Sequence, residues 1–205
     1  MLSHHHLFIP GIEPGHTPLL LLHGSGGTER DMVPLASELS PKSTAVALRG
    51  PVPWEGGFAF FRRFEDRTID EYDLVTQAGL LSESVVQIGL DRGFAKPPVA
   101  VGFSNGAIMA AALVMLYPGL LSGAVLFRPL LPLATDPDAR IPETPVLIID
   151  GSDDARRSPL DGSRLAQRLT RTGANVTHHL LPTGHSIIAD DLRLAREWLA
   201  RLPVS

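Results

Sequence analysis

Val99-Ala100-Val101-Gly102-Phe103-Ser104-Asn105-Gly106-Ala107-Ile108-Met109-Ala110 is the stretch that decides the fold of this chain. Residues 99–103 are apolar and rich in valine, which predicts a buried strand. Residues 105–117 are rich in alanine, methionine and leucine and stop before a proline, which predicts a helix. Ser104 therefore lies in a sharp turn between strand and helix, where the two flanking glycines leave room for the crowded backbone.

The position of Ser104 predicts a chemical role. A turn of this kind lifts the serine hydroxyl clear of the sheet. It also aims the next backbone N–H group, that of Asn105, at whatever the serine attacks. We therefore interpret Ser104 as a nucleophile; the alternative is a tight turn without any chemistry.

The composition sets limits on the class of protein. A length of 205 residues predicts one domain, residues 1–205, with a sizeable core. The formal net charge is −4 and there is no basic block, so nucleic acid is not an expected partner. The absence of cysteine excludes disulfides, thiol catalysis and cysteine-bound metal. The apolar run at residues 19–22 is too short to cross a membrane, so no membrane partner is expected.

The N-terminal region gives two further expectations. It has no basic segment followed by an apolar run, so no signal peptide is predicted and the cytoplasm is the default location. His4, His5 and His6 are adjacent and could bind a metal ion. Three neighbouring histidines at a terminus are more typical of an exposed loop or an added tag, so we expect no metal site.

Predicted strands and helices alternate along the chain. The predicted strands are residues 7–10, 19–22, 44–48, 99–103, 122–127, 146–149 and 175–181. The predicted helices are residues 28–39, 70–90, 105–117, 160–172 and 187–202. This alternation predicts an α/β fold, with a mainly parallel central sheet and helices on both faces. Residues 128–144 are too few for a separate lid domain, so an open site is expected.

The loop His23-Gly24-Ser25-Gly26-Gly27-Thr28 follows a buried predicted strand, and its glycines let the backbone come close to a ligand. One interpretation is a phosphate cradle, but the lysine of a Walker loop is missing and the glycine spacing differs from that of dinucleotide-binding loops. The other is an oxyanion loop, in which the backbone N–H of Ser25 points at a developing negative charge. His23 could be a base, but its place at a strand end indicates a buried histidine that shapes the loop.

A serine hydroxyl needs a base to accept its proton at neutral pH, and histidine titrates in the right range. His185 is the best candidate because it follows a predicted strand, next to a glycine, and comes after the acidic candidates. Asp150, Asp153 and Asp154 lie at or after the end of another predicted strand. Asp150 should lie too low in the turn, and we prefer Asp154 to Asp153 because it reaches over the strand end.

Residues 50–67 form a long irregular stretch with several aromatic side chains. Long ordered loops in compact domains often line sites, so we expect Trp54, Phe60 and Phe61 to wall a substrate pocket. The alternative is that these rings pack on the core. Arg62 and Arg63 could face an acidic group of a substrate, or form structural salt bridges, which we prefer.

Several segments between about residues 19 and 200 match one known family. They are His23-Gly24-Ser25-Gly26-Gly27, Leu48-Arg49-Gly50-Pro51, Phe60-Phe61-Arg62-Arg63-Phe64, Asp70-Glu71-Tyr72-Asp73-Leu74, Gly102-Phe103-Ser104-Asn105-Gly106, Phe127-Arg128-Pro129, residues 151–154 and Gly184-His185. In these segments the chain resembles the phospholipase/carboxylesterase branch of the α/β hydrolases, above all the small carboxylesterases related to bacterial quinone- and hydroquinone-resistance hydrolases.

The resemblance implies an esterase whose triad is Ser104, Asp154 and His185. It also implies an oxyanion hole formed by the backbone N–H groups of Ser25 and Asn105, no cofactor, and often a homodimer. One segment departs from the family pattern, in which an apolar pair and a proline follow the acid. Here the acid is followed by Ala155-Arg156-Arg157-Ser158-Pro159, which is longer and charged.

We therefore expect a serine carboxylesterase that hydrolyses small or short-chain carboxylic esters through an acyl-enzyme on Ser104, without a metal. The alternative enzyme is an acyl-thioesterase or lysophospholipase acting on longer acyl chains, which a wide apolar groove would favour. A third interpretation is a non-catalytic ligand-binding protein on the same scaffold. Such a protein would not need a serine, an acid, a histidine and a glycine loop together.

Overall fold

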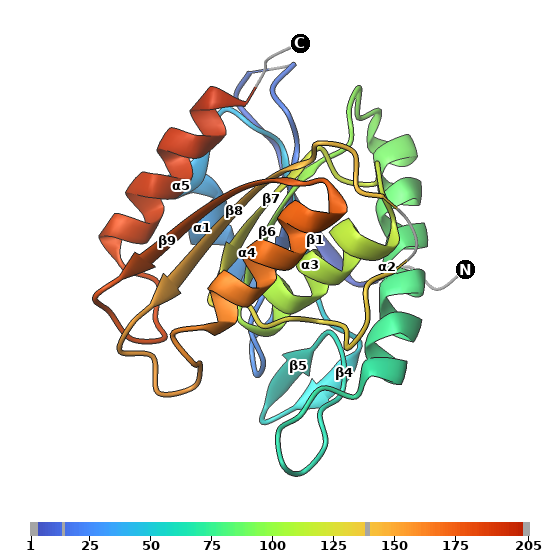
Figure 1. Ribbon diagram of the computed structural model, residues 1–205. Helices are drawn as coiled ribbons and strands as arrows, with labels where there is room; N and C mark the ends of the chain where they lie inside the picture. The colour runs from blue at the N-terminus through green and yellow to red at the C-terminus, as the bar shows by residue number, and fades with distance from the viewer. Residues whose placement is uncertain (1–3, 14, 138–139, 203–205) are drawn as a thin grey trace.

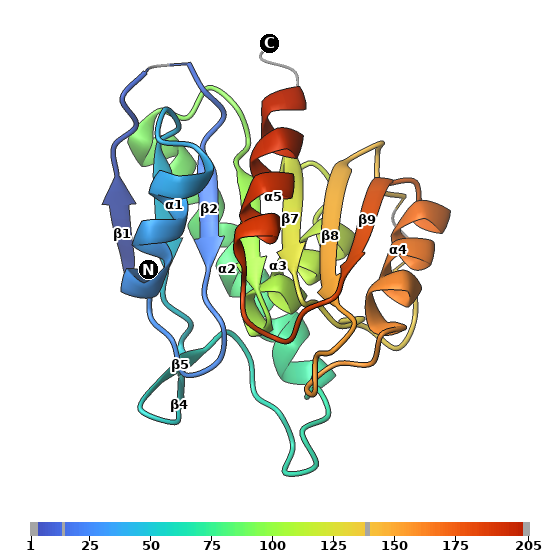
Figure 2. The ribbon, with the colours of Figure 1, turned by 90° about the vertical axis from the view of Figure 1, so that its left-hand side faces the viewer.

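Seven strands form one sheet in the residues that this computed structural model describes, which are 4–13, 15–137 and 140–202. The strand order is β1-β3-β2-β6-β7-β8-β9. β1 pairs antiparallel with β3, and the other neighbouring pairs of this sheet are parallel. Figure 2 shows the sheet running from β1 at one edge to β9 at the other.

The described elements have the following bounds. The strands of the sheet are β1 (His6–Ile9), β2 (Leu19–Leu22), β3 (Ala45–Leu48), β6 (Val99–Phe103), β7 (Gly123–Phe127), β8 (Pro145–Gly151) and β9 (Asn175–Leu181), and β4 (Val52–Trp54) and β5 (Gly57–Ala59) form a separate hairpin. The helices are α1 (Val33–Leu39), preceded by a 3₁₀ helix (Glu29–Met32), α2 (Glu71–Arg92), α3 (Asn105–Leu116), α4 (Asp161–Thr172) and α5 (Ala189–Arg201).

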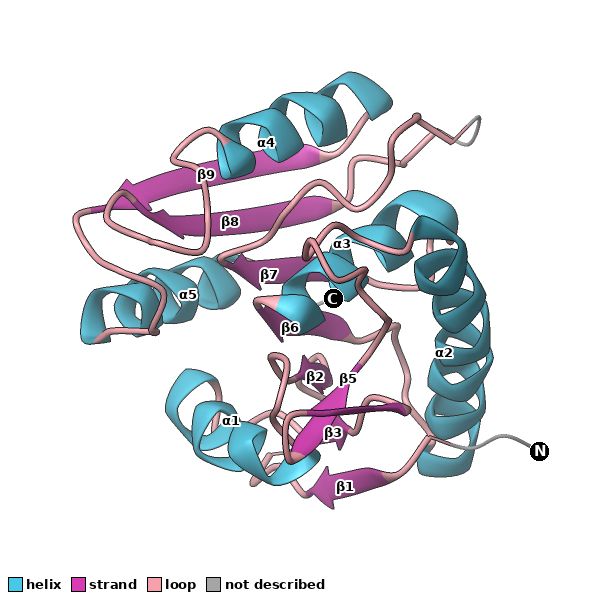
Figure 3. Ribbon diagram, turned by 90° about the horizontal axis from the view of Figure 1, so that it is seen from below, coloured by secondary structure: helices cyan, strands magenta, loops and turns pink. Residues whose placement is uncertain are grey.

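The core has two layers, one on each face of the sheet. Successive residues of a strand point to opposite faces, so Leu20 and Ala100 pack with the apolar side chains of α2, α3 and α4. Leu21 and Val101 pack on the other face with side chains of α1 and α5. Figure 3 shows α1 and α5 on one side of the strands and α2 and α3 on the other. Because both faces are covered, the inner strands are apolar throughout.

The predicted α/β fold is confirmed, and each predicted strand and helix is present. Their ends shift by at most two residues, except that the first turn of the helix predicted at 28–39 is the 3₁₀ helix and α1 begins only at Val33. The β4–β5 hairpin is the element that the sequence does not predict. Glu55 and Gly56 form its turn with φ of 42° and 82°. Such a turn needs positive φ at both positions and favours asparagine or aspartate at the first. Because a glutamate stands at the first turn position and Pro53 lies inside β4, the sequence lacks the usual pattern of a hairpin.

The parallel arrangement brings the carboxyl ends of β2, β6, β8 and β9 to one end of the sheet. Ligands bind at this end in open α/β sheets. Figure 1 shows this end at the bottom, where the β4–β5 hairpin also lies. No separate lid covers it within the described residues. None of the helices in the described ranges has the length and apolarity that a membrane crossing requires.

Candidate active site

Ser104 lies between β6 and α3 in a backbone conformation that few serines adopt. Its φ is 52° and its ψ is −107°, and its N–H donates to the carbonyl oxygen of Phe127 at 2.9 Å. A Cβ on Gly106 would lie 2.2 Å from the oxygen of Leu22, and one on Gly102 would lie 2.5 Å from the oxygen of Gly106. The turn therefore requires both glycines, and its strain at the serine is of the kind that persists at functional sites.

The loop after β9 brings the ring of His185 to this serine. Ser104 Oγ lies 3.0 Å from His185 Nε2, and His185 Nδ1 lies 2.7 Å from Asp154 Oδ2. An ionised carboxylate only accepts hydrogen bonds, so Nδ1 carries the ring proton and Nε2 accepts from the serine hydroxyl. The structure thus brings together the carboxylate, imidazole and hydroxyl that the sequence singles out.

The three acidic candidates near the end of β8 lie in different surroundings. The side chain of Asp154 is 0% exposed and contacts His185. Asp150 Oδ2 instead lies 2.9 Å from Nε2 of His178, on β9. Asp153 is exposed to solvent. The geometry therefore favours Asp154 as the partner of the histidine.

The electrostatic surroundings keep His185 neutral near pH 7. Burial lowers the pKa of His185 below its ordinary value of 6.5, while the hydrogen bond to Asp154 raises it. The positive charges of Arg157 and Arg156 lower the pKa of His185 further. A histidine with this pKa is unprotonated at neutral pH and is able to accept a proton.

Arg128 holds the loop that carries the histidine. It is 0% exposed, and it forms a two-pronged ion pair with Asp191 of α5, at 2.8 Å for each of its two bonds. Its other N–H groups donate to the carbonyl oxygens of Gly184, Ser186 and Ile149 at 3.0–3.1 Å. Sequence analysis missed this role. The available signal was an arginine directly after an entirely apolar strand.

The glycine loop after β2 lies beside the same site. His23 Nδ1 donates to the carbonyl oxygen of Gly24 at 2.7 Å, and His23 Nε2 accepts the N–H of Gly50 at 3.0 Å. Both ring nitrogens are thus occupied, and burial lowers the pKa of His23. The prediction that His23 shapes the loop is confirmed. Ser25 lines the same cavity as Ser104.

Some aromatic side chains of the stretch 50–67 line the cavity, and others are buried in the core. Trp54 lines the cavity that contains Ser104. Phe60 and Phe61 are 1% and 0% exposed and pack in the core layer of α2 and α3, so the expectation that they wall the pocket is wrong. The N–H of Phe60 donates to the side-chain oxygen of Asn105 at 2.7 Å, and this contact between distant parts of the sequence fixes the chain against α3.

The two neighbouring arginines also have different positions. Arg62 lies 3.4 Å from Asp70 and 3.5 Å from Asp73, which confirms the structural salt bridge for this residue. Arg63 instead lines the cavity with Ser104, and its guanidinium lies 5.9 Å from the ring centre of Phe61. The expected salt bridge is therefore wrong for Arg63.

The cavity at the serine has a volume of about 360 Å³. Arg157 is the contact that sequence analysis did not anticipate, because its Nη2 donates to Ser104 Oγ at 2.9 Å. The charged segment that departs from the family pattern was the signal for it. The lining includes Gly24, Ser25, Trp54, Glu55, Arg63, Arg67, Phe103, Ser104, Leu130, Ala155, Arg156, Arg157 and His185.

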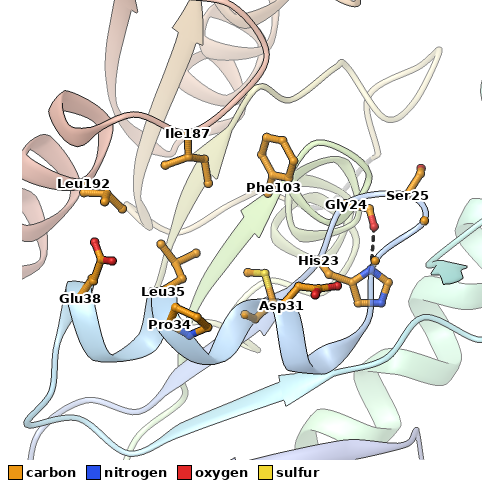
Figure 4. Close-up of a pocket in the computed structure, with 13 residues that line it drawn as sticks. His23, Gly24, Ser25, Asp31, Pro34, Leu35, Glu38, Phe103, Ile187 and Leu192 are labelled. Atoms are coloured by element: carbon orange, nitrogen blue, oxygen red, sulfur yellow. Dashed lines mark hydrogen bonds between the residues drawn. The ribbon is translucent and has the colours of Figure 1, made fainter.

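A second, larger cavity of about 480 Å³ lies on the other side of the glycine loop. Figure 4 shows it between Leu35 of α1 and Leu192 of α5, with Phe103 between Ile187 and the glycine loop. Gly24, Ser25 and Phe103 line both cavities, whereas Ser104 and His185 line only the smaller one. This second cavity is a largely apolar groove next to the serine site, although Asp31 and Glu38 also line it.

The described residues contain no group of three or more histidine, aspartate or glutamate side chains placed to hold a metal ion. His6 belongs to β1, and His4 Nδ1 lies 2.8 Å from Ser84 Oγ of α2. The expectation that this segment is an exposed loop is therefore wrong for these two residues.

A parallel sheet with a strained serine after a central strand, and its histidine after a later one, defines an α/β hydrolase. A family profile described as Phospholipase/Carboxylesterase matches residues 4–202, and the chain belongs to that family. MhqD of Bacillus subtilis (strain 168), which is named as a hydrolase, is 33% identical over 181 residues, covering 88% of this chain and 90% of its own.

Two solved structures extend the comparison. A carboxylesterase from Bacillus cereus superposes with a TM-score of 0.93 at 33% identity, covering 98% of this chain and 95% of its own. A carboxylesterase from Mesorhizobium loti superposes with a TM-score of 0.86 at 33% identity, covering 90% and 88%. The protein is a carboxylic ester hydrolase.

The contacts of the acidic residues predict unequal effects of substitution. Asp154→Asn should lower kcat by about a thousandfold or more, because the amide no longer fixes the tautomer of His185. Asp153→Asn alters an exposed side chain and should change kcat by no more than about twofold. Steady-state kinetics on a chromogenic ester compare the two variants. A larger loss in Asp153→Asn would overturn the assignment.

The lowered pKa of His185 predicts the acid limb of the pH profile. If His185 is the base, only its neutral ring can accept the serine proton, so kcat/KM should rise with a midpoint below pH 6.5 and stay on its plateau through neutrality. Arg157→Gln removes a positive charge that opposes protonation of the ring, so the midpoint should move to higher pH. A midpoint at or above 6.5 in the unaltered enzyme would contradict this account.

Proposed function

We propose that the enzyme hydrolyses small carboxylic esters through an acyl-enzyme on Ser104. The observation that carries the proposal is the hydrogen-bonded chain in which Ser104 Oγ lies 3.0 Å from His185 Nε2 and His185 Nδ1 lies 2.7 Å from buried Asp154. A nucleophile, a base and a group that orients the base are the parts that this chemistry requires.

The reaction has two halves. Ser104 Oγ attacks the ester carbonyl carbon while His185 takes the hydroxyl proton, and the resulting imidazolium returns that proton to the departing alcohol. Water then attacks the acyl-enzyme and gives a proton to the same nitrogen, and the acid product leaves as the serine regains its proton. Asp154 holds the ring in the required tautomer and stabilises its positive charge.

Two backbone N–H groups complete the proposed site. Asn105 is the first residue of α3, so its N–H has no partner within the helix and faces the developing charge beside Ser104. Ser25 supplies the second N–H from the glycine loop, which lines the same cavity. Each donor of this type contributes about 10²–10³ in rate.

The shape of the cavity supports small substrates. The cavity has a volume of about 360 Å³. It opens to solvent, since no lid covers it in the described part of the chain. The apolar portions of its wall come from Trp54, Phe103 and Leu130. The groove in Figure 4 supports the alternative, a thioesterase or lysophospholipase. A long acyl chain would have to pass from Ser104 around Phe103 to reach it.

Labelling and kinetics test the proposal together. A fluorophosphonate probe should label the unaltered protein, and Ser104→Ala should lose both the label and ester hydrolysis. Ser152→Ala removes another serine, whose hydroxyl donates to Asp153 Oδ1 at 3.2 Å, and should retain both. Labelling and hydrolysis by Ser104→Ala at the unaltered rate would refute the nucleophile.

The same assay separates the two substrate classes. Para-nitrophenyl acetate and butyrate should give higher kcat/KM than the decanoate and palmitate. A preference for the two long chains would favour the groove and the lysophospholipase or thioesterase function.

A further inference from the structure

Positive charge is concentrated at the serine of an otherwise acidic protein. Arg63, Arg67, Arg156 and Arg157 line the cavity of about 360 Å³ that contains Ser104. Glu55 is the one acidic side chain among its described lining residues. The chain as a whole carries a formal net charge of −4. The local excess of cations is therefore a property of this cavity and not of the overall composition.

Arg157 is the member of this arginine cluster that touches the nucleophile. Its Nη2 donates to Ser104 Oγ at 2.9 Å, its Nε donates to the carbonyl oxygen of Arg128 at 3.0 Å, and its Nη1 donates to that of Arg156 at 3.0 Å. These three acceptors are uncharged. Burial, and then the charge of Arg63, lower the pKa of Arg157 to about 10, although the negative charges of Asp154, Asp161 and Asp150 raise it, so the guanidinium is still positive at neutral pH.

The other members of the cluster likewise form no ion pair with an acidic side chain of the described residues. Arg63 is half-buried and donates to the carbonyl oxygen of Arg67 at 2.9 Å. Burial and the charge of Arg67 lower the pKa of Arg63. Within the described residues, none of the four arginines forms an ion pair, whereas neighbouring Arg62 pairs with Asp70 and Asp73. Like charges held together in this way favour an anion between them.

From this arrangement we propose that the enzyme selects esters whose acyl part carries a carboxylate close to the scissile carbonyl. Monoesters of short dicarboxylic acids, such as succinate monoesters, are the substrate class that fits. The proposal rests on the proposed function, because it takes Ser104 as the nucleophile. Arg157 and Arg63 would be the specificity residues, with Arg67 and Arg156 adding charge at the rim.

The short distance from Arg157 to the nucleophile sets the length of the acyl part. A carbonyl carbon bonded to Ser104 Oγ lies within a few ångströms of Arg157 Nη2, so a carboxylate only a few bonds further on can reach the same guanidinium. Arginine presents a planar set of donors that matches the two oxygens of a carboxylate.

A carboxylate in this place also assists the base. The charges of Arg157 and Arg156 oppose protonation of His185, the event that accompanies attack by the serine. An anionic substrate offsets these charges as it binds. The overall reaction remains balanced, since the monoester and water give the diacid and the alcohol, and no other reactant is needed.

Two esters of matched shape test the proposal. Monoethyl succinate carries the carboxylate, and ethyl isocaproate has an isopropyl group in its place. The unaltered enzyme should hydrolyse the succinate monoester with a kcat/KM at least about tenfold higher, as expected for one charge-assisted pair of hydrogen bonds. Added salt should reduce this preference, because it screens the charges in an open cavity.

Three variants assign the preference to the cluster. Arg63→Gln and Arg157→Gln should each lower the preference by about tenfold, chiefly through a higher KM for the succinate monoester. Arg62→Gln is the matched control. It removes the adjacent arginine, whose partners lie outside the cavity, and should leave both constants within about twofold.

Inorganic phosphate serves as a comparison anion, because guanidinium groups also bind phosphoryl groups. Succinate should inhibit hydrolysis of ethyl isocaproate competitively and more strongly than inorganic phosphate at equal concentration. Stronger inhibition by phosphate would overturn the carboxylate assignment.

The remaining outcomes distinguish a failure of this proposal from a failure of the proposed function. Equal kcat/KM values for the two esters, or a preference that survives in both Arg63→Gln and Arg157→Gln, would overturn the proposal while Ser104-dependent hydrolysis still supports the esterase. Loss of hydrolysis of both esters, with no fluorophosphonate label on Ser104, would instead refute the proposed function on which it rests.

Discussion

The buried guanidinium of Arg128 is the contact on which the site geometry depends. It follows β7, lies against the end of β8, and joins α5 through Asp191. It also holds the backbone on both sides of the histidine, at Gly184 and Ser186. All five of its N–H donors are used, as a buried charge requires. The loop that carries His185 therefore keeps its place beside Ser104 without any covering lid in the described chain.

The same arginine links that frame to the electrostatics of the cavity. Its carbonyl oxygen accepts from Nε of Arg157, which places the second guanidinium beside Ser104 Oγ. The serine hydroxyl can donate to His185 and accept from Arg157 at once, because it has one proton and two lone pairs. The frame thus places a cation beside Ser104 Oγ, and the charge of this cation contributes to the lowered pKa of His185.

Sequence patterns predicted the parts of this structure that follow from local chemistry. The strands covered on both faces are apolar runs, and the turn at Ser104 is visible from its two glycines. The position of Asp154 followed from its reach beyond a strand end. The inward direction of Phe60 and Phe61 could not be predicted, because it depends on a hydrogen bond to Asn105, forty-five residues away. Arg128 and Arg157 contact partners that lie even further away in the sequence, at 63 and 53 residues.

The central claim is that the acyl group passes through Ser104. It is tested most directly by quenching the enzyme in acid during turnover of para-nitrophenyl acetate and locating the acetyl group by peptide mass spectrometry. A good leaving group makes breakdown of the acyl-enzyme the slow step, so the intermediate should accumulate. The account predicts acetylation of the peptide that contains Ser104, at the hydroxyl of that residue. Acetyl transfer to another side chain during productive turnover, with Ser104 unmodified, would contradict it.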